Sequence, residues 1–487
     1  MKRHYDGFAR WGAVTHEKIE NAKCMNNLRV AFIQDYCRLE DIRSFVQSAV
    51  NQDSRIGLLF ASKGPDCLVV VKPNWVQEAH ENQPEIWEPV ISNPVVVLAV
   101  VEAIAEAMGG QGTICLCDAP HTYADFESIV ARGKLKSNYE SLKERYPDLT
   151  FELVDLRREI WVRKEQVIVE RRENNPDPRG YVQLDLGESS LFYRHSGEGR
   201  YYGADYDSGV VNKHHCGQIQ EYLLAGTPMM CDLFVNIAKL KTHKKTGITC
   251  CLKNLVGING DKNWLPHHIE GGPCTGGDEF AEEHFTHAVE RRVKKFAQYI
   301  MTALPSFVGN WVYRKTRKVG QAMLGDSDSV IRNGNWQGND TCWRMALDLN
   351  RALLYGNPDG SWREAGQSKH YLAFVDGIIG GEGNGPLCPD AVQSGILVAG
   401  ANPACVDAVC ARLMGFDPKD VPIVARAFAP HRWPIADTAM ADLTVFDERC
   451  GSEVLLNDLK PCVPGGFRPH FGWLKLAQTN RTGSPKR

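Results

Sequence analysis

The chain has 487 residues, of which 43% are hydrophobic and 24% are charged, and its formal net charge is -3 at pH 7. This composition is ordinary for a soluble globular protein, and the length suits two domains or one elaborated domain. The slightly negative charge excludes nucleic-acid binding by the charge of the whole chain. We therefore expect no nucleic-acid partner, and any cationic site must be local.

The sequence shows no targeting or membrane-spanning pattern. Its start, MKRHYDGFARWGAVTHEKIE, lacks the continuous apolar stretch of a signal peptide. The most apolar segment, Pro94–Met108, is interrupted by Glu102 and Glu106, which disfavours a membrane span. We therefore expect a cytoplasmic protein without a transmembrane segment.

The cysteines predict no metal cluster. There are 16 of them, and they are scattered without any CxxC spacing. The pairs Cys115/Cys117 and Cys250/Cys251 are too close together for standard zinc knuckles. We interpret them as reduced, mostly buried thiols and expect no iron–sulfur cluster.

The first predicted elements are helical and then alternate between strand and helix. Residues 1–60 predict a helical N-terminal extension, because Ile42, Phe45 and Val46 recur at helical spacing. The apolar run Cys67–Val71 suits a strand buried on both faces, which stops before Pro73. The next stretch, 94–116, reads as a helix capped at its start and closed by glycines, followed by a second apolar run. Strand, helix and strand at this spacing indicate a βαβ unit and a parallel sheet.

The rest of the chain continues this pattern around two insertions. Residues 151–212 alternate like strands and contain turn-rich segments, which predicts a β-rich insertion. A helical insertion is expected at about 280–330. Further elements are predicted as strands at Leu233–Ile237, Tyr371–Val375 and Gly395–Ala399, and as a helix at Ala404–Met414.

The expected fold is therefore α/β, with a mostly parallel sheet flanked by helices. We place this domain at residues 61–440. A C-terminal extension at 441–487 would contain a last strand or two after Leu443 and a disordered end from Thr479.

One segment is distinguished by its charge. Residues 291–318 carry Arg and Lys at both ends, no acidic residue, and an apolar, aromatic middle broken by Pro305. An amphipathic helix pair packed on the core is one interpretation. Peripheral contact with an anionic membrane, which would suit a lipid-linked substrate, is the other.

The densest group of candidate site residues lies between Cys231 and His268. This segment starts as an apolar strand and continues into a cationic stretch with glycines at 257 and 260. A strand that leads into such a stretch suits the binding of an anion. On an extended segment, Lys239, Lys241 and His243 would point to the same side.

Polar residues also follow the other predicted strands. In open parallel sheets, ligands bind beyond the carboxyl ends of the strands, so these residues should converge on one crevice. Lysines there would neutralise phosphate or carboxylate groups of a substrate. The predicted substrate-binding residues are Lys72, Asn74, Lys239, Lys253, Asn254, Asp376, Glu382 and Asn384.

Lys241, His243 and Asp118 are the predicted catalytic residues. A lysine close to other cations has a lowered pKa and can act as a base, as can a histidine. Asp118 could orient such a base or bind a divalent metal, and the other metal candidates are Asp376, Glu382 and His267. A metal site made from His243 and one member of each of the pairs 214–215 and 267–268 is an alternative, although adjacent histidines point apart in regular structure.

The glycine-rich stretch Gly380–Pro386 predicts a flexible loop whose N–H groups could hold an anion. It is not GxGxxG before a helix, and it lacks the GK[ST] of a phosphate-binding loop. The chain also lacks a GxSxG elbow. We therefore predict neither NAD binding, nor ATP hydrolysis, nor serine hydrolase chemistry.

Several blocks of sequence resemble the domain-of-unknown-function-362 family. The blocks occur in the family's order, and they are VVVKPNW at 69–75, LCDAP at 116–120, VNIAKLKTHKKTGITCCLKNLVGINGDKNWLPHH at 235–268, GNWQGNDTCWRMALDLNR at 334–351, VDGIIGGEGNGP at 375–386 and NPACVDAVCARLMG at 402–415. The chain departs from the usual pattern at Ala238, where proline commonly precedes KLKTH. Some members carry a ferredoxin-like module, whose cysteine spacings this chain lacks.

The resemblance implies an α/β fold but no defined activity. It also implies that the family shares a site at Lys72, Asn74, Asp118, Lys239, Lys241, His243, Lys253, Asn254, Asp376 and Glu382. Arg344 lies in a block typical of the longer members and is a second candidate for anion binding.

Three functions remain open from the sequence. The first is an enzyme that acts on an anionic small molecule bearing phosphate or carboxylate, such as a sugar or lipid-linked intermediate. The second is a non-catalytic protein that binds an anion or cofactor, or serves in assembly. The third is a metal- or redox-cofactor protein that uses histidine and cysteine side chains.

Overall fold

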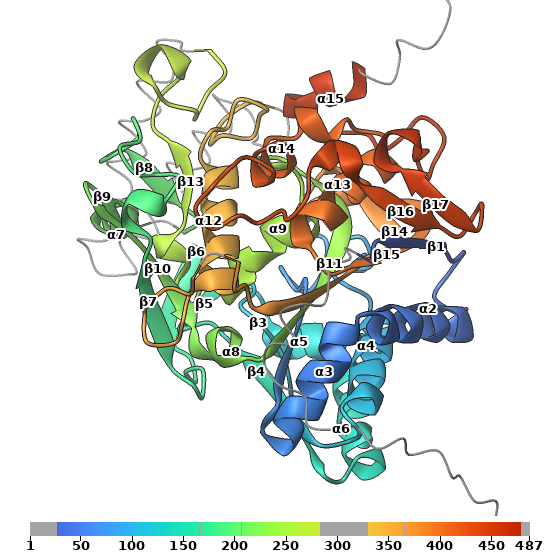
Figure 1. Cartoon of the computed structure of the whole chain (residues 1–487). Helices are drawn as coiled ribbons and strands as arrows, with labels where there is room; N and C mark the ends of the chain where they lie inside the picture. Colours follow the sequence, from blue (N-terminus) through green and yellow to red (C-terminus); the bar gives the residue numbers. More distant parts are fainter. Residues whose placement is uncertain (1–26, 165–166, 206, 283–329, 365, 479–487) are drawn as a thin grey trace, which may run out of the picture.

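A large mixed sheet forms the centre of the molecule (Figure 1). The computed structural model describes residues 27–164, 167–205, 207–282, 330–364 and 366–478. Five strands at one side run parallel to their neighbours, and β12 (Gly247–Ile248) pairs with β11 off the main path. The order across the sheet is β17 (Ser452–Leu455), β16 (Thr444–Asp447), β1 (Arg29–Phe32), β15 (Cys388–Gly400), β14 (His370–Asn384), β11 (Leu233–His243), β2 (Leu68–Pro73), β3 (Gly112–Asp118) and β4 (Leu149–Asp155).

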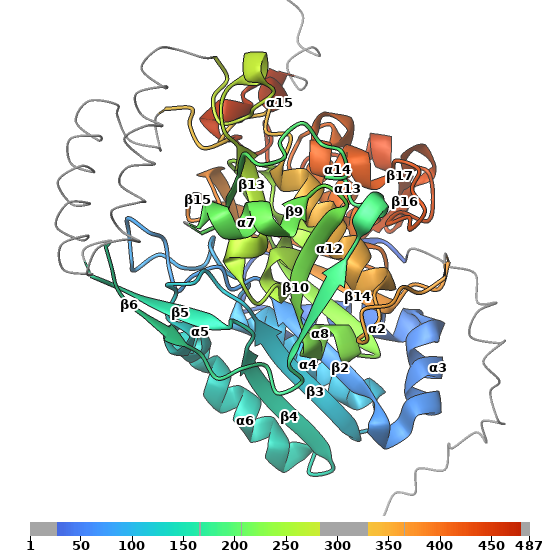
Figure 2. The ribbon, with the colours of Figure 1, turned by 90° about the vertical axis from the view of Figure 1, so that its left-hand side faces the viewer.

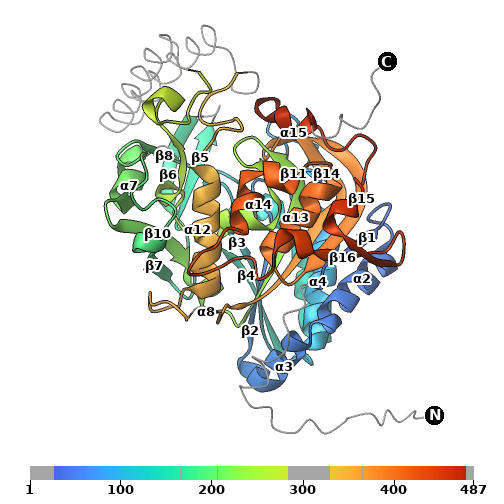
Figure 3. The same ribbon diagram turned by 45° about the horizontal axis from the view of Figure 1, so that its top comes forward.

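Helices cover both faces of this sheet (Figure 3). One face packs against α2 (Leu39–Gln52), α3 (Ser54–Lys63), α4 (Pro94–Ala107), α5 (Phe126–Ala131) and α6 (Leu135–Arg145). The other packs against α9 (Cys250–Asn254), α12 (Cys342–Tyr355), α13 (Pro403–Leu413) and α14 (Pro422–Ala427). Alternate side chains of β2 point to opposite faces of the sheet. Val69 and Val71 pack in the core beneath α2 to α6, and Val70 packs in the core on the other face. This explains why a strand buried on both faces has no polar alternation.

Three small antiparallel sheets flank this centre (Figure 2). They are β5 (Glu159–Lys164) with β6 (Val167–Glu173), β7 (Tyr181–Asp185) with β10 (Ile219–Ala225) and β9 (His215–Cys216), and β8 (Tyr201–Gly203) with β13 (Pro266–Ile269). Short helices α7 (Ser208–His214), α8 (Gly226–Met230) and α15 (Lys475–Gln478) complete the described helices. The predicted α/β fold is confirmed, as is the strand-rich character of 151–212, although β4 within that range belongs to the large sheet.

Two strands are longer than the sequence predicts. β11 continues past Ile237 to His243, so the lysines that follow the apolar run still lie in the strand. β14 continues past Val375 to Asn384, so the prediction of a flexible loop at Gly380–Pro386 is wrong for most of that stretch. The glycines there permit close packing, because a Cβ on Gly385 would lie 1.9 Å from a backbone oxygen of β11.

The N-terminal segment also differs from a purely helical extension. β1 lies within the range 1–60 and pairs with both β15 and β16, so it is part of the large sheet. The predicted late strands are present as β16 and β17. The membrane-contact hypothesis at 291–318, most of the helical insertion at 280–330 and the tail from Thr479 lie outside the described residues. Within the described part of the chain, no helix is long and apolar enough to cross a membrane.

Candidate functional site

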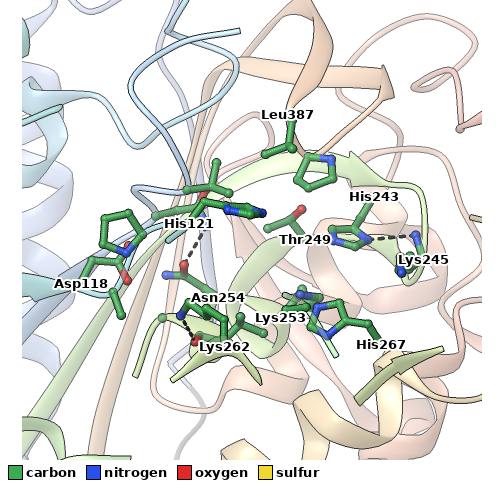
Figure 4. A pocket seen from close by; sticks show the side chains of 18 of the residues that line it. Asp118, His121, His243, Lys245, Thr249, Lys253, Asn254, Lys262, His267 and Leu387 are labelled. Atoms are coloured by element: carbon green, nitrogen blue, oxygen red, sulfur yellow. Dashed lines mark hydrogen bonds between the residues drawn. The ribbon is translucent and has the colours of Figure 1, made fainter. Parts of the chain in front are cut away.

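A cavity of about 250 Å³ opens at the carboxyl ends of β2, β3 and β11 (Figure 4). Its walls also include the end of α9, the strand β13 and the turn between β14 and β15. This is the position at which parallel sheets bind ligands. The lining contains six lysines and a single carboxylate, namely Lys72, Lys241, Lys244, Lys245, Lys253, Lys262 and Asp118.

The single carboxylate is paired with one of the lysines. Asp118 Oδ1 lies 2.8 Å from Lys72 Nζ, and the two side chains are 4% and 0% exposed. Lys72 also donates to Asn254 Oδ1 and to the Pro73 carbonyl, at 3.0 Å each. The Trp75 N–H donates to the second oxygen of Asp118. The pair is therefore held by its surroundings and leaves five lysines of the lining without a carboxylate partner in the cavity wall.

A row of buried amides extends from this ion pair into the sheet. Asn254 accepts from Asn74 Nδ2 at 2.8 Å and donates to Asn236 Oδ1 at 2.7 Å. Asn74 Oδ1 is buried and accepts no hydrogen bond within the described structure, and the same holds for Thr249 Oγ1. Both residues line the cavity. These oxygens are therefore available to a ligand that carries a hydrogen-bond donor.

Helix α9 is fixed by α13, a helix of the same layer. Asp407 of α13 accepts from the N–H groups of Cys251 at 2.7 Å and of Leu252 at 3.0 Å. Burial raises the pKa of this carboxyl to about 7, and these hydrogen bonds act against the rise. The contact holds the first turn of α9, so Lys253 and Asn254 are presented to the cavity.

Two uncompensated lysines are held by carbonyl oxygens. Lys241 Nζ donates to the carbonyls of Val90 and Pro386, and Lys262 Nζ donates to those of Val256 and Asn259. Burial lowers the pKa of Lys262 to about 7 and of Lys245 to about 8. Burial also lowers the pKa of Lys241 well below its usual value, and the charges of neighbouring lysines lower it further. Burial and, for Lys241, the neighbouring lysine charges therefore disfavour the protonated forms of these three amines.

The two histidines at one end of the cavity have opposite hydrogen-bonding roles. His243 Nδ1 accepts the N–H groups of Lys245 at 3.0 Å and Thr246 at 3.3 Å, so the neutral ring carries its proton on Nε2. His267 Nδ1 lies 2.9 Å from the Leu265 carbonyl, to which it must donate, so its Nε2 has a free lone pair. Burial, and next the charge of Lys253, lower the pKa of both rings well below the usual value.

Most of the predicted central residues come together here. The lining includes the predicted residues Lys72, Asn74, Asp118, Lys241, His243, Lys253, Asn254 and His267. His267 and His268 do point apart, since His268 stacks on Tyr202 with ring centroids 4.9 Å apart. Neither His214 nor His215 lines the cavity.

Five predicted residues lie elsewhere. Lys239 and Asp376 form a fully buried ion pair of 2.8 Å, which also contacts the hydroxyl of Tyr36. Glu382 pairs with Arg468, and Arg344 pairs with Asp340. Asn384 ends β14 and pairs with Cys388 in the sheet. These five side chains are absent from the lining of the described cavity.

Sequence reasoning did not select five polar lining residues, which are His121, Lys244, Lys245, Thr249 and Lys262. His121 follows β3 by three residues and packs against Tyr123 with the two rings tilted, and burial lowers its pKa to about 3. Thr249, Lys245 and Lys262 flank α9 in the long central block. The position of His121 after a strand end could have indicated it, by the same reasoning that indicated Asp118.

Among the described residues, no three His, Cys, Asp or Glu side chains are grouped so that they could hold a metal ion. Asp118 is engaged by Lys72 and by a backbone N–H, and Asp376 by Lys239.

Comparison with known protein families identifies a domain in the middle of the chain. The family model described as "Domain of unknown function (DUF362)" matches residues 197–412. No curated protein matches the chain. The matched range contains β11, α9 and β13, whereas Lys72, Asn74, Asp118 and His121 precede it. The cavity is therefore built from both the matched range and the strands before it.

Proposed function

We propose that this chain, which carries a DUF362 domain at residues 197–412, is an enzyme that acts on a small anionic molecule held by the lysines of the cavity. The family description assigns no activity, so the proposal rests on the site. The observation that carries it is the excess of lysines in the cavity lining, which contains six lysines and one carboxylate.

An anionic ligand would relieve this imbalance. Asp118 already compensates Lys72, so the remaining amines repel one another and lose protons to burial. A phosphate or carboxylate bound among them would accept their hydrogen bonds and stabilise their charged forms. The volume of about 250 Å³ corresponds to about eight water molecules, at about 30 Å³ each, which suits a small metabolite rather than a polymer.

The histidines supply a means of moving a proton. His267 Nε2 has the lone pair that a general base needs, while His243 Nε2–H is a donor that can stabilise negative charge on a reacting oxygen. This division of roles favours His267 as the base and assigns hydrogen-bond donation to His243. Both rings line the same cavity as the lysines.

Thermal unfolding in the presence of anions tests the proposal. We expect inorganic phosphate, pyrophosphate or malonate to raise the unfolding temperature of the wild-type protein, because a ligand at 100 times its Kd adds about 2.7 kcal/mol to stability. The shift should be lost in Lys241→Met and in Lys262→Met. It should persist in Lys136→Met, which removes an exposed lysine of α6 that pairs with Glu127. Equal shifts in all variants, or none in the wild type, would refute the proposed site.

A further inference from the structure

Lys253 differs from the other buried lysines of the cavity in having an unrestrained amine. The residue is 7% exposed and lines the cavity (Figure 4). Within the described structure, its Nζ makes neither a hydrogen bond nor an ion pair. Lys72, Lys241 and Lys262 are instead held by two or more oxygen atoms each.

The surroundings of Lys253 disfavour its protonated form. Burial lowers its pKa, and the cation of Lys72 lowers it further, against an opposing influence of the Cys342 thiol. A neutral lysine amine has a free lone pair and is a nucleophile toward carbonyl carbon. Lysines placed beside other cations in a desolvated site are activated in this way.

We propose that Lys253 forms an imine with the carbonyl group of a small carboxylate ligand, of the 2-oxo acid class. The inference rests on the proposed anion-binding function, because the other lysines would hold the carboxylate while Lys253 attacks the carbonyl. Lys241 and Lys262 are the residues placed to hold it.

The step is balanced without any further reagent. The Lys253 Nζ lone pair forms a bond to the carbonyl carbon, and the carbonyl π electrons move to oxygen. The nitrogen loses a proton and the oxygen gains one, which gives a carbinolamine. The carbon–oxygen bond then breaks, the hydroxyl leaves as water with a second proton from nitrogen, and the carbon–nitrogen double bond forms. One carbonyl and one amine thus yield one imine and one water.

The two histidines suit the proton movements of this step. His267 Nε2 can take the proton from nitrogen and return it to the departing hydroxyl. His243 Nε2–H can donate a hydrogen bond to the oxygen as negative charge develops on it. Lys253, His243 and His267 all line the same cavity.

Reductive trapping tests the inference. The full-length protein is incubated with pyruvate, glyoxylate or oxaloacetate in the presence of sodium borohydride, which reduces an imine to a stable amine. Peptide mapping by mass spectrometry then locates the adduct. We expect a single adduct on the wild-type peptide that contains Lys253, no such adduct in Lys253→Arg, and unchanged labelling in Lys136→Arg. We expect His267→Gln to form it about 100-fold more slowly.

The wild-type peptide map tests the proposed imine at Lys253 even if a variant fails to fold. The absence of an adduct with all three oxo acids, or an adduct on Lys244, Lys245 or Lys262 instead of Lys253, would overturn the inference. Calorimetric titration of the same protein with malonate separates this failure from that of the proposed function. If malonate binds but no imine forms, only the proposed role of Lys253 is refuted. If malonate does not bind and no imine forms, the proposed anion site is refuted as well.

Discussion

Gly257 shows how closely single residues define the cavity. It lies in the 3-10 turn η4 (Leu255–Ile258), directly against the Lys72–Asp118 pair. A Cβ at this position would be 1.9 Å from Asp118 Oδ1 and 2.6 Å from Lys72 Nζ. No side chain can occupy that space unless the buried ion pair moves.

We therefore predict that Gly257→Ala displaces the ion pair, destabilises the protein by about 1–3 kcal/mol and weakens anion binding. Urea unfolding and calorimetric titration with pyrophosphate measure the two effects. Gly57→Ala is the matched control, because its Cβ would meet no atom within 4 Å. In an exposed position of α3 the alanine should stabilise the helix by about 0.5–1 kcal/mol. If Gly257→Ala keeps the stability and anion affinity of the wild type, the Lys72–Asp118 pair is not constrained by the space at Gly257.

At the scale of elements, strand length decided which predicted residues reach the site. Lys239 and Lys241 were expected to act together, since alternate residues of a strand share a face. Both lie in β11, whose pairing with β14 shifts register between them. Lys239 is consequently opposite Asp376, deep in the sheet, whereas Lys241 lies near the strand end and lines the cavity.

Strand length also explains the positions of Asp376, Glu382 and Asn384. The apolar run Tyr371–Val375 predicts a strand that ends at Asp376, but β14 continues for eight residues beyond it, to Asn384. Glycines are weak strand formers, so the sequence of this stretch favours a loop. Pairing with β11 and β15 holds it as a strand. Those contacts join distant parts of the chain, so local patterns do not indicate them.

The two lysines of β11 should therefore respond differently to substitution. Lys239→Met with Asp376→Asn removes a buried ion pair without leaving a single charge, so the protein should fold and bind pyrophosphate with a Kd within about threefold of the wild-type value. Lys241→Met should raise that Kd by about tenfold or more, since a hydrogen bond from a charged group contributes about 1.5–3 kcal/mol. Isothermal titration calorimetry compares them. A larger loss of affinity in the double variant than in Lys241→Met would contradict the placement of the anion site at Lys241.

At the scale of the whole molecule, three separate stretches of sequence form the cavity. They are residues 72–121, 203–267 and 386–387, and the last two lie within the family match. The apolar runs of the central strands made the α/β fold predictable, and the rule of strand ends indicated the common crevice. The sequence did not predict β1. Its short segment RVAF is held as a strand by pairing with β15 and β16, which lie hundreds of residues away in the chain.

We expect the empty cavity to lose protons and to regain them when an anion binds. Burial lowers the pKa of Lys262 to about 7 and of Lys245 to about 8, so both are partly neutral at pH 8. An anion stabilises their charged forms and raises these pKa values, so binding takes up protons and affinity falls as pH rises above 7. Because these pKa values are lower in the folded protein, the unfolded chain binds more protons than the free folded protein above about pH 7. The two lysines therefore make the stability of the free protein rise with pH.

Calorimetric titration with malonate at pH 8, in buffers of different ionisation enthalpy, measures this proton uptake directly. Malonate is fully ionised at that pH, so the protons counted belong to the protein. We predict saturable binding at one site with net uptake of protons, and a smaller uptake in Lys262→Met. Proton release, or the absence of saturable binding by malonate and by sulfate alike, would contradict the account.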